Sequence, residues 1–228
     1  MPAYFTDATF KFLRALSRHN ERAWFQAHKA DYERHVREPF QRLILDLQPK
    51  LAAVSAHYRA DPKAVGGSLF RIQRDTRFST DKAPYKDWQG ARLFHARHRQ
   101  VEAPSFYIHL QPGECFVGAG VWHPQPDALR KLRQFIVDNP GSWKAAAHAP
   151  AFRRRYGLDE SEMLTRLPRG FPAEFAFADD LRHRNYAAFR PLDDAVVTGP
   201  RLRQVLEADL VALAPLVDYL CAALDLEF

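Results

Sequence analysis

The side chains best suited to polar chemistry in this sequence lie close together, between residues 71 and 86. The segment reads Arg-Ile-Gln-Arg-Asp-Thr-Arg-Phe-Ser-Thr-Asp-Lys-Ala-Pro-Tyr-Lys, with five basic residues and two aspartates in sixteen positions. Guanidinium groups bind carboxylates and phosphates through pairs of parallel hydrogen bonds, and an aspartate between two arginines can hold them in place. The segment therefore predicts a site for a small anionic ligand that carries a phosphate or a carboxylate.

We predict a division of roles within this segment. The side chains expected to bind the ligand are Arg71, Arg74, Arg77, Tyr85 and Lys86. The side chains expected to do chemistry are Asp75, Asp81 and Lys82. Either aspartate would orient a hydrogen-bond donor or act as a general base.

The local pattern also predicts how these side chains are positioned. If residues 70–78 are extended, Arg71, Gln73, Asp75 and Arg77 lie on one face, because side chains alternate along a strand. The polar loop that follows would return Lys82 close by. We therefore expect Arg77, Asp75 and Lys82 to converge on a concave surface that accepts an anion.

Two alternatives compete with the ligand site. The spacing alone is equally consistent with a structural ion-pair network that fixes a loop. In that interpretation, Phe78 and Tyr85 are packing anchors. The net charge of +6 and the pI of about 9.4 also leave open a non-catalytic module that binds nucleic acid or an acidic protein. The basic residues are scattered along the chain, so the charge does not choose between these interpretations.

The spacing within the segment resembles the signature of a known family. Arg71-x-x-Arg74-Asp75-x-Arg77-Phe78, followed by Asp81-Lys82-x-x-Tyr85, is similar to the motif of the bacterial and fungal family known as domain of unknown function 2461. Further similar segments are Asn20-Glu21-Arg22-Ala23-Trp24-Phe25, Gly118-x-Gly120-x-Trp122-x-Pro124 and Leu164-x-Arg166-x-Pro168-Arg169-Gly170-Phe171. The resemblance covers essentially the whole chain and implies a single domain, residues 1–228. It carries over no catalytic residues, so the roles assigned above come from side-chain chemistry.

Hydrophobic periodicity predicts helices toward both ends of the chain and strands between them. Helices are expected over residues 6–18, 21–35, 39–51, 127–136, 143–148 and 202–224, with Pro49 and Pro215 kinking or dividing theirs. Strands are expected over residues 68–76, 91–97, 105–111, 115–122, 186–189 and 195–198. Residues 105–111 and 115–122 form a predicted hairpin in the sheet that contains 68–75, and Gly118 and Gly120 predict a bulge or a close backbone approach. The fold class is α+β, a mainly antiparallel sheet packed against N-terminal and C-terminal helices.

Composition sets the remaining expectations. No apolar run approaches the roughly 18 residues that span a bilayer, and no signal-peptide pattern is present, so we expect a cytoplasmic protein without a membrane partner. Cys115 and Cys221 match no metal or redox spacing, which predicts free thiols. The ten histidines show no zinc-binding pattern, and the sequence points to no metal and to no particular cofactor.

Overall fold

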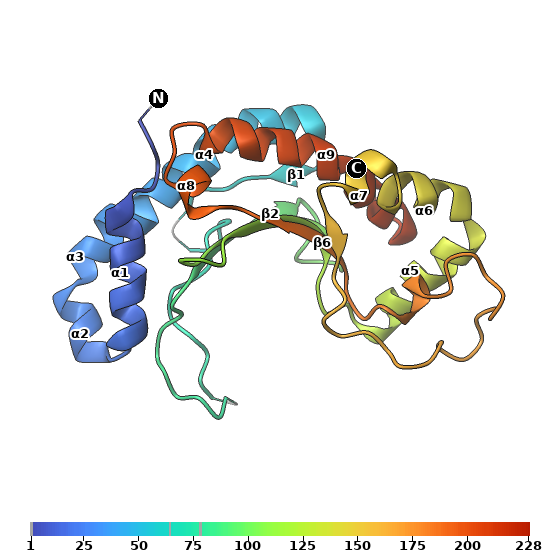
Figure 1. The fold of residues 1–228 in the computed structure, drawn as a ribbon, viewed down its shortest axis with the longest axis horizontal. Coiled ribbons are helices and arrows are strands. Elements are labelled where there is room, and N and C mark those ends of the chain that lie inside the picture. Colours follow the sequence, from blue (N-terminus) through green and yellow to red (C-terminus); the bar gives the residue numbers. More distant parts are fainter. Residues whose placement is uncertain (1, 64, 78) are drawn as a thin grey trace.

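The computed structural model describes residues 2–63, 65–77 and 79–228. The chain forms an arch with a β-sheet at its centre (Figure 1). Helices α4 (Glu38–Val54) and α9 (Leu202–Ala223) lie above the sheet, and α1 (Asp7–Arg18) belongs to one leg of the arch. Helices α5 (Pro126–Asp138) and α6 (Pro140–Ala147) belong to the other leg. Helices from both halves of the sequence thus surround one sheet.

The segment between α1 and α4 is not the single helix predicted over 21–35. It is divided into α2 (Arg22–Ala27), α3 (Lys29–Tyr32) and a π-helical turn over Glu33–Arg37 that runs into α4. The first break lies at His28, whose ring stacks on Trp24 with 4.1 Å between ring centres. At the π turn, the hydroxyl group of Thr9 in α1 donates a 2.7 Å hydrogen bond to the carbonyl oxygen of His35. Both breaks in the helix coincide with side-chain contacts. Hydrophobic periodicity does not contain such contacts, so it predicted one continuous helix.

The sheet of the described residues has six antiparallel strands in the order β1-β2-β3-β4-β6-β5. Their bounds are Tyr58–Arg59 (β1), Gln89–His95 (β2), Ser105–Leu110 (β3), Phe116–Val121 (β4), Gly157–Leu158 (β5) and Tyr186–Pro191 (β6). Strands β3 and β4 form the predicted hairpin, with Phe106 opposite Ala119. The predicted α+β class with an antiparallel sheet is confirmed.

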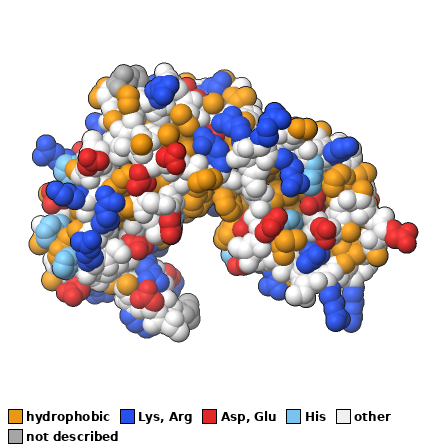
Figure 2. All heavy atoms as spheres, viewed as in Figure 1, with side chains coloured by type: hydrophobic (Ala, Val, Ile, Leu, Met, Phe, Trp, Pro, Cys, Tyr) orange, Lys and Arg blue, Asp and Glu red, His pale blue; other side chains and the backbone are white. Residues whose placement is uncertain are grey.

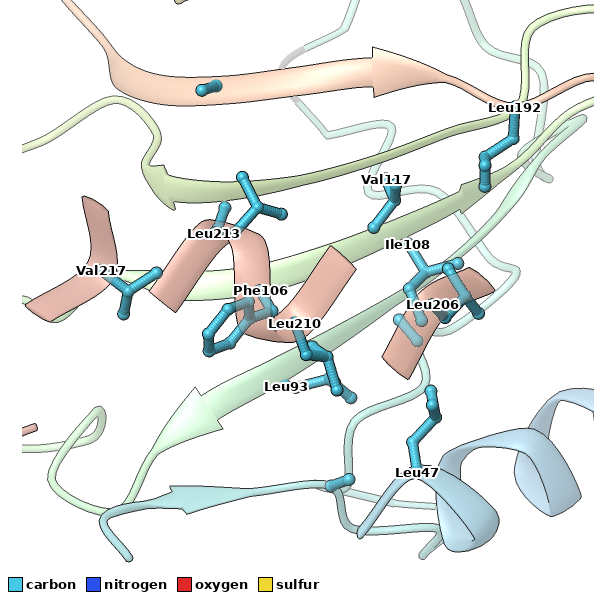
Figure 3. Packing of buried hydrophobic residues seen from close by; sticks show 14 of the residues in the cluster. Leu47, Leu93, Phe106, Ile108, Val117, Leu192, Leu206, Leu210, Leu213 and Val217 are labelled. Carbon is cyan, nitrogen blue, oxygen red and sulfur yellow. The ribbon is translucent and has the colours of Figure 1, made fainter. Parts of the chain in front are cut away.

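One face of the sheet packs against α9 and forms the hydrophobic core (Figure 3). The labelled core residues of the strands are Leu93, Phe106, Ile108 and Val117, and those of α9 are Leu206, Leu210, Leu213 and Val217. The predicted cover of the sheet by the segment 201–224 is confirmed. The short helices α7 (Pro150–Arg153) and α8 (Asp194–Val197) and a 3-10 turn over Asp180–Arg182 complete the helical part. Among the described residues, no helix combines the length and apolar character needed to cross a bilayer.

Two of the predicted strands are wrong. Residues 68–76 contribute only isolated bridges, Leu69 opposite Ala91 and Gln73 opposite Tyr85. The segment leaves β2 and pairs instead with residues 84–86, where Pro84 has no N–H group to continue a ladder. Residues 195–198 belong largely to α8, which begins after an aspartate and carries another in its first turn, a position that favours acidic residues.

Pro49 and Pro215 do not divide their helices. A proline removes the hydrogen bond to the carbonyl group four residues earlier. Those carbonyl groups belong to Leu45 and Val211, which are 57% and 47% exposed. Water can therefore replace the lost bond on the solvent side, and α4 and α9 continue past the prolines.

The two glycines of β4 lie against the backbone of β6. A β-carbon on Gly118 would lie 2.5 Å from the carbonyl oxygen of Ala188, and one on Gly120 would lie 2.1 Å from that of Tyr186. Gly120 also has a φ of +140°, which residues with a side chain rarely adopt. The predicted close backbone approach is confirmed.

Candidate functional site

Residues 72–86 form an irregular hairpin, here called the motif hairpin, that projects below the sheet beside the N-terminal helices (Figure 1). The N–H group of Arg74 donates to the carbonyl oxygen of Pro84 at 2.9 Å, and that of Lys86 donates to Ile72 at 2.8 Å. Ile72 and Tyr85 are buried at the base of the hairpin. The charged residues predicted for the site therefore lie on a projecting loop with a buried base, and not on a regular strand.

Two ion pairs order the loop of the motif hairpin. Arg77 donates two side-chain hydrogen bonds to Asp75, from Nε at 3.0 Å and from Nη2 at 2.7 Å. Arg74 forms an ion pair with Asp81, whose other oxygen accepts a 2.9 Å hydrogen bond from the N–H group of Ala83. Phe78, a predicted packing anchor, lies outside the described residues.

These contacts make the two carboxylates poor proton acceptors. The hydrogen bonds from Arg77 lower the pKa of Asp75, and those from the Ala83 backbone and from Arg74 lower the pKa of Asp81. A carboxylate with a lowered pKa holds its negative charge more firmly and accepts a proton less readily. The arrangement is therefore suited to fixing charges in place more than to moving protons.

Lys82 is directed toward the backbone of its own loop. Its ammonium group donates a 3.0 Å hydrogen bond to the carbonyl oxygen of Thr76. Its neighbour Asp81 pairs with Arg74. Lys82 thus closes the loop from Thr76 to Lys82.

The motif hairpin is joined to the N-terminal helices through Tyr85. The Asn20 side chain donates to the carbonyl oxygen of Tyr85 at 2.9 Å and accepts from the Tyr85 N–H group at 3.0 Å. The Tyr85 ring stacks on Phe25 of α2, with 4.1 Å between ring centres and an angle of 19°. Residues 20–25 and 71–86, two of the segments that resemble the family named above, therefore meet in space.

A pocket of about 620 Å³, here called the motif pocket, lies where the motif hairpin meets α1 and its following turn. The residues that line it are Ser17, Asn20, Arg74, Asp75, Asp81, Ala83, Tyr85, Lys86, Asp87 and Trp88. Five of the eight predicted site residues are among them, whereas Arg71, Arg77 and Lys82 are not. Of the trio expected to converge, Arg77 and Asp75 are paired with each other, whereas Lys82 binds the carbonyl oxygen of Thr76. Only Asp75 lines the pocket.

Lys86 and Arg74 are the half-buried cations among the residues that line this pocket, and Arg74 is paired with Asp81. Burial, followed by the positive charges of Arg71 and Arg74, lowers the pKa of Lys86. Its ammonium group donates a 2.6 Å hydrogen bond to the Arg71 carbonyl oxygen and lies 5.0 Å from the ring centre of Trp88. Within the described part of the chain, no carboxylate forms an ion pair with Lys86.

The sequence prediction missed four polar or aromatic residues of the pocket. Ser17 and Asn20 come from the end of α1 and the turn after it, and Ser17 donates a 3.2 Å hydrogen bond to Asp87. Asp87 and Trp88 directly follow the motif, so extending it by two residues would have included them. Asn20 lies in a segment already noted for its family resemblance. In the described residues, no group of three histidine, cysteine or acidic side chains could hold a metal ion.

Comparison with protein families identifies the relationship. The family model described as conserved hypothetical protein, DUF2461, matches residues 8–219. The chain belongs to the DUF2461 family. Neither a curated protein nor a solved structure matches this DUF2461 chain significantly. The matched residues include all elements from α1 to most of α9, and therefore both the sheet and the motif pocket.

Proposed function

We propose that this DUF2461 protein binds a small anionic ligand, carrying a phosphate or a carboxylate, in the motif pocket. The observation that carries the proposal is Lys86, a half-buried cation in the pocket lining without a carboxylate partner among the described residues. Burial, followed by the neighbouring positive charges of Arg71 and Arg74, makes its ammonium form costly, and a bound anion would offset that cost. The proposal is for binding, with Lys86 as its centre.

The rest of the lining suggests how such a ligand would be held. Arg74 lies in the same lining, and its pairing with Asp81 keeps its guanidinium group in a fixed position for a second contact. Asp75 and Asp87 would accept hydrogen bonds from hydroxyl or amino groups of the ligand. A ligand with one anionic group and several hydroxyl groups fits this lining better than a polyanion, because three carboxylates would repel additional negative charge.

The chain offers a matched pair of lysines to test this proposal. Lys86→Met removes the cation of the lining that has no carboxylate partner among the described residues, and Lys82→Met removes a lysine of the same hairpin that does not line the pocket. Isothermal titration with inorganic phosphate and with gluconate, which has one carboxylate and several hydroxyl groups, would measure binding to the wild type and to both variants. We expect Lys86→Met to weaken binding by about tenfold or more and Lys82→Met to leave it unchanged.

Three results would contradict the proposal. The first is a wild type that binds neither probe. The second is a Lys86→Met variant, folded by circular dichroism, with wild-type affinity. The third is a Lys82→Met variant that loses binding as Lys86→Met does, which would move the site to the loop. The first result would favour the structural interpretation of the motif, in which its charges only order the hairpin.

A further inference from the structure

A second pocket, here called the N-terminal pocket, lies between residues 3–9 and the helical segment that runs into α4. Its volume is about 350 Å³, and small-molecule sites measure about 300–1,000 Å³. The residues that line it are Ala3, Tyr4, Thr6, Thr9, Arg34, His35, Glu38, Pro39 and Arg42. Among the described residues, the N-terminal pocket and the motif pocket share no lining residue.

The helical wall of this pocket has its shape from Pro39. A proline has no N–H group, so the carbonyl oxygen of His35, four residues earlier, receives no helical hydrogen bond from it. The hydroxyl group of Thr9 donates a 2.7 Å hydrogen bond to that oxygen instead. The N–H group of Glu38 donates to the carbonyl oxygen of Glu33, five residues earlier, which is the spacing of a π turn. The helix therefore departs from α geometry just before α4.

The π turn brings two arginines onto one face of the helical segment. In a regular α-helix, residues eight apart differ in direction by about 80°, because one turn takes about 3.6 residues. A π turn contains one residue more than an α turn, which reduces this difference to about 20°. Arg34 and Arg42 are eight residues apart with the π turn between them, and both line the pocket. Glu38 lies halfway between them and lines it as well.

The opposite wall, residues 3–9, is held in place by contacts with α4. The ring of Phe5 is buried and packs edge-to-face on Phe40, with 5.3 Å between ring centres. The hydroxyl group of Tyr4 donates a hydrogen bond to the carboxylate of Asp46. Together with the bond from Thr9 described above, these contacts fix the N-terminal segment against the helix. The pocket is therefore formed before any ligand binds.

The charged side chains of the N-terminal pocket are available to a ligand. Figure 2 shows Lys and Arg side chains on the leg with the N-terminal helices, with acidic side chains among them. Arg34, Glu38 and Arg42 are exposed, and none of them has a hydrogen bond or ion pair with another described residue. Arg37 of the same turn, by contrast, pairs with Glu33 at 2.7 Å. Exposed pairs within a helix contribute little, so a ligand would displace no strong contact.

We propose that the N-terminal pocket binds a free amino acid with an acidic side chain, aspartate or glutamate. The two carboxylates of the ligand pair with Arg34 and Arg42, and its ammonium group pairs with Glu38. Two arginines alone would favour any small dianion, whereas the carboxylate between them repels a ligand that brings no positive charge. The pocket shares no lining residue with the motif pocket, so this proposal is independent of the function proposed above.

Two sets of probes separate the contributions of the three ligand groups. L-glutamate and L-aspartate contain all three. Glutarate and succinate are the same dicarboxylates without the ammonium group, and glutamine and asparagine lack the side-chain carboxylate. Titration of the purified chain, followed by calorimetry, would measure each affinity. We expect glutamate or aspartate to bind at least about tenfold more tightly than either of its two analogues, because each analogue lacks one charged contact.

Variants assign the binding to this pocket. Arg34→Gln and Arg42→Gln should each weaken binding of the acidic amino acid at least about tenfold. Glu38→Gln should weaken binding of the amino acid but strengthen that of its dicarboxylate analogue, because it removes a negative charge. All three positions are exposed, so these replacements are compatible with folding. Arg130→Gln, at an exposed position of α5, is the matched control and should bind as the wild type does.

Each contrary result overturns the proposal. A wild type that binds neither glutamate nor aspartate would do so, as would equal affinities for the amino acid and its dicarboxylate analogue. Wild-type affinity in both folded arginine variants would place the binding elsewhere, and an unchanged preference in Glu38→Gln would remove the contact with the ammonium group. Loss of amino acid binding in Lys86→Met would assign it to the motif pocket instead.

Discussion

The side-chain amide of Asn20 forms with Tyr85 both hydrogen bonds that a neighbouring strand would form, one to its carbonyl oxygen and one from its N–H group. The two residues are 65 positions apart in the sequence. A single side chain therefore takes the place of an edge strand and holds the base of the motif hairpin against the N-terminal helices. The motif pocket exists where these two segments meet.

Replacing Asn20 with alanine should loosen this junction. Both backbone groups of Tyr85 would lose their partners in a partly buried place, which we expect to cost about 1–3 kcal/mol of unfolding free energy. Urea unfolding followed by circular dichroism measures the change. Gln26→Ala, at an exposed position of the neighbouring helix α2, is the control and should change stability by less than about 0.5 kcal/mol. Equal stability of the two variants would show that the amide does not hold the hairpin.

The stacking of Tyr85 on Phe25 should matter more than the tyrosine hydroxyl group. No hydrogen bond joins that hydroxyl group to another described residue. We expect Tyr85→Phe to cost less than about 1.5 kcal/mol and Tyr85→Ala to cost about 3–5 kcal/mol, because only the second change removes the buried ring. Thermal unfolding of both variants tests this order. A large loss in the phenylalanine variant would reveal a role for the hydroxyl group beyond packing.

Arg77→Ala distinguishes a surface ion pair from a buried network. The Arg77 side chain is 77% exposed, and exposed ion pairs contribute little to stability. We therefore expect an unchanged melting temperature and unchanged phosphate binding, because Arg77 does not line the pocket. Differential scanning calorimetry and calorimetric titration on the same preparation give both values. A clear fall in melting temperature would support the network interpretation of the motif.

Acid should destabilise the fold through buried histidines before it protonates the loop aspartates. Burial lowers the pKa of His109, so below its unfolded value of about 6.5 the unfolded chain binds the proton more readily. Its contribution to stability is therefore present at neutral pH and decreases as the pH falls through the window below 6.5. In His109→Asn, the unfolding free energy should change less between pH 7.5 and pH 5 than in the wild type. Gln26→Ala, an exposed substitution that changes no titratable group, should retain the wild-type slope.

Elements with a strong local pattern could be predicted from the sequence, whereas elements shaped by distant contacts could not. The β3–β4 hairpin depends on two apolar runs and a Pro-Gly turn, and α9 on regular leucine spacing, so both could be predicted from short windows. The motif segment looked extended because its residue types alternate, yet Pro84 and the partners of Arg74 and Arg77 shape it into a loop. The contact of Asn20 with Tyr85 joins residues 65 positions apart, which no local pattern contains.

The position of α9 has a consequence for how the chain folds. This helix covers the apolar face of the sheet, yet it begins at Leu202, whereas the central strands end by Val121. As the polypeptide emerges during synthesis, β2, β3 and β4 are complete about eighty residues before their cover. The apolar face of these strands would then be exposed to solvent and to other nascent chains, which favours aggregation. A chaperone that shields this surface in the interval should raise the yield of native protein more than one acting after release.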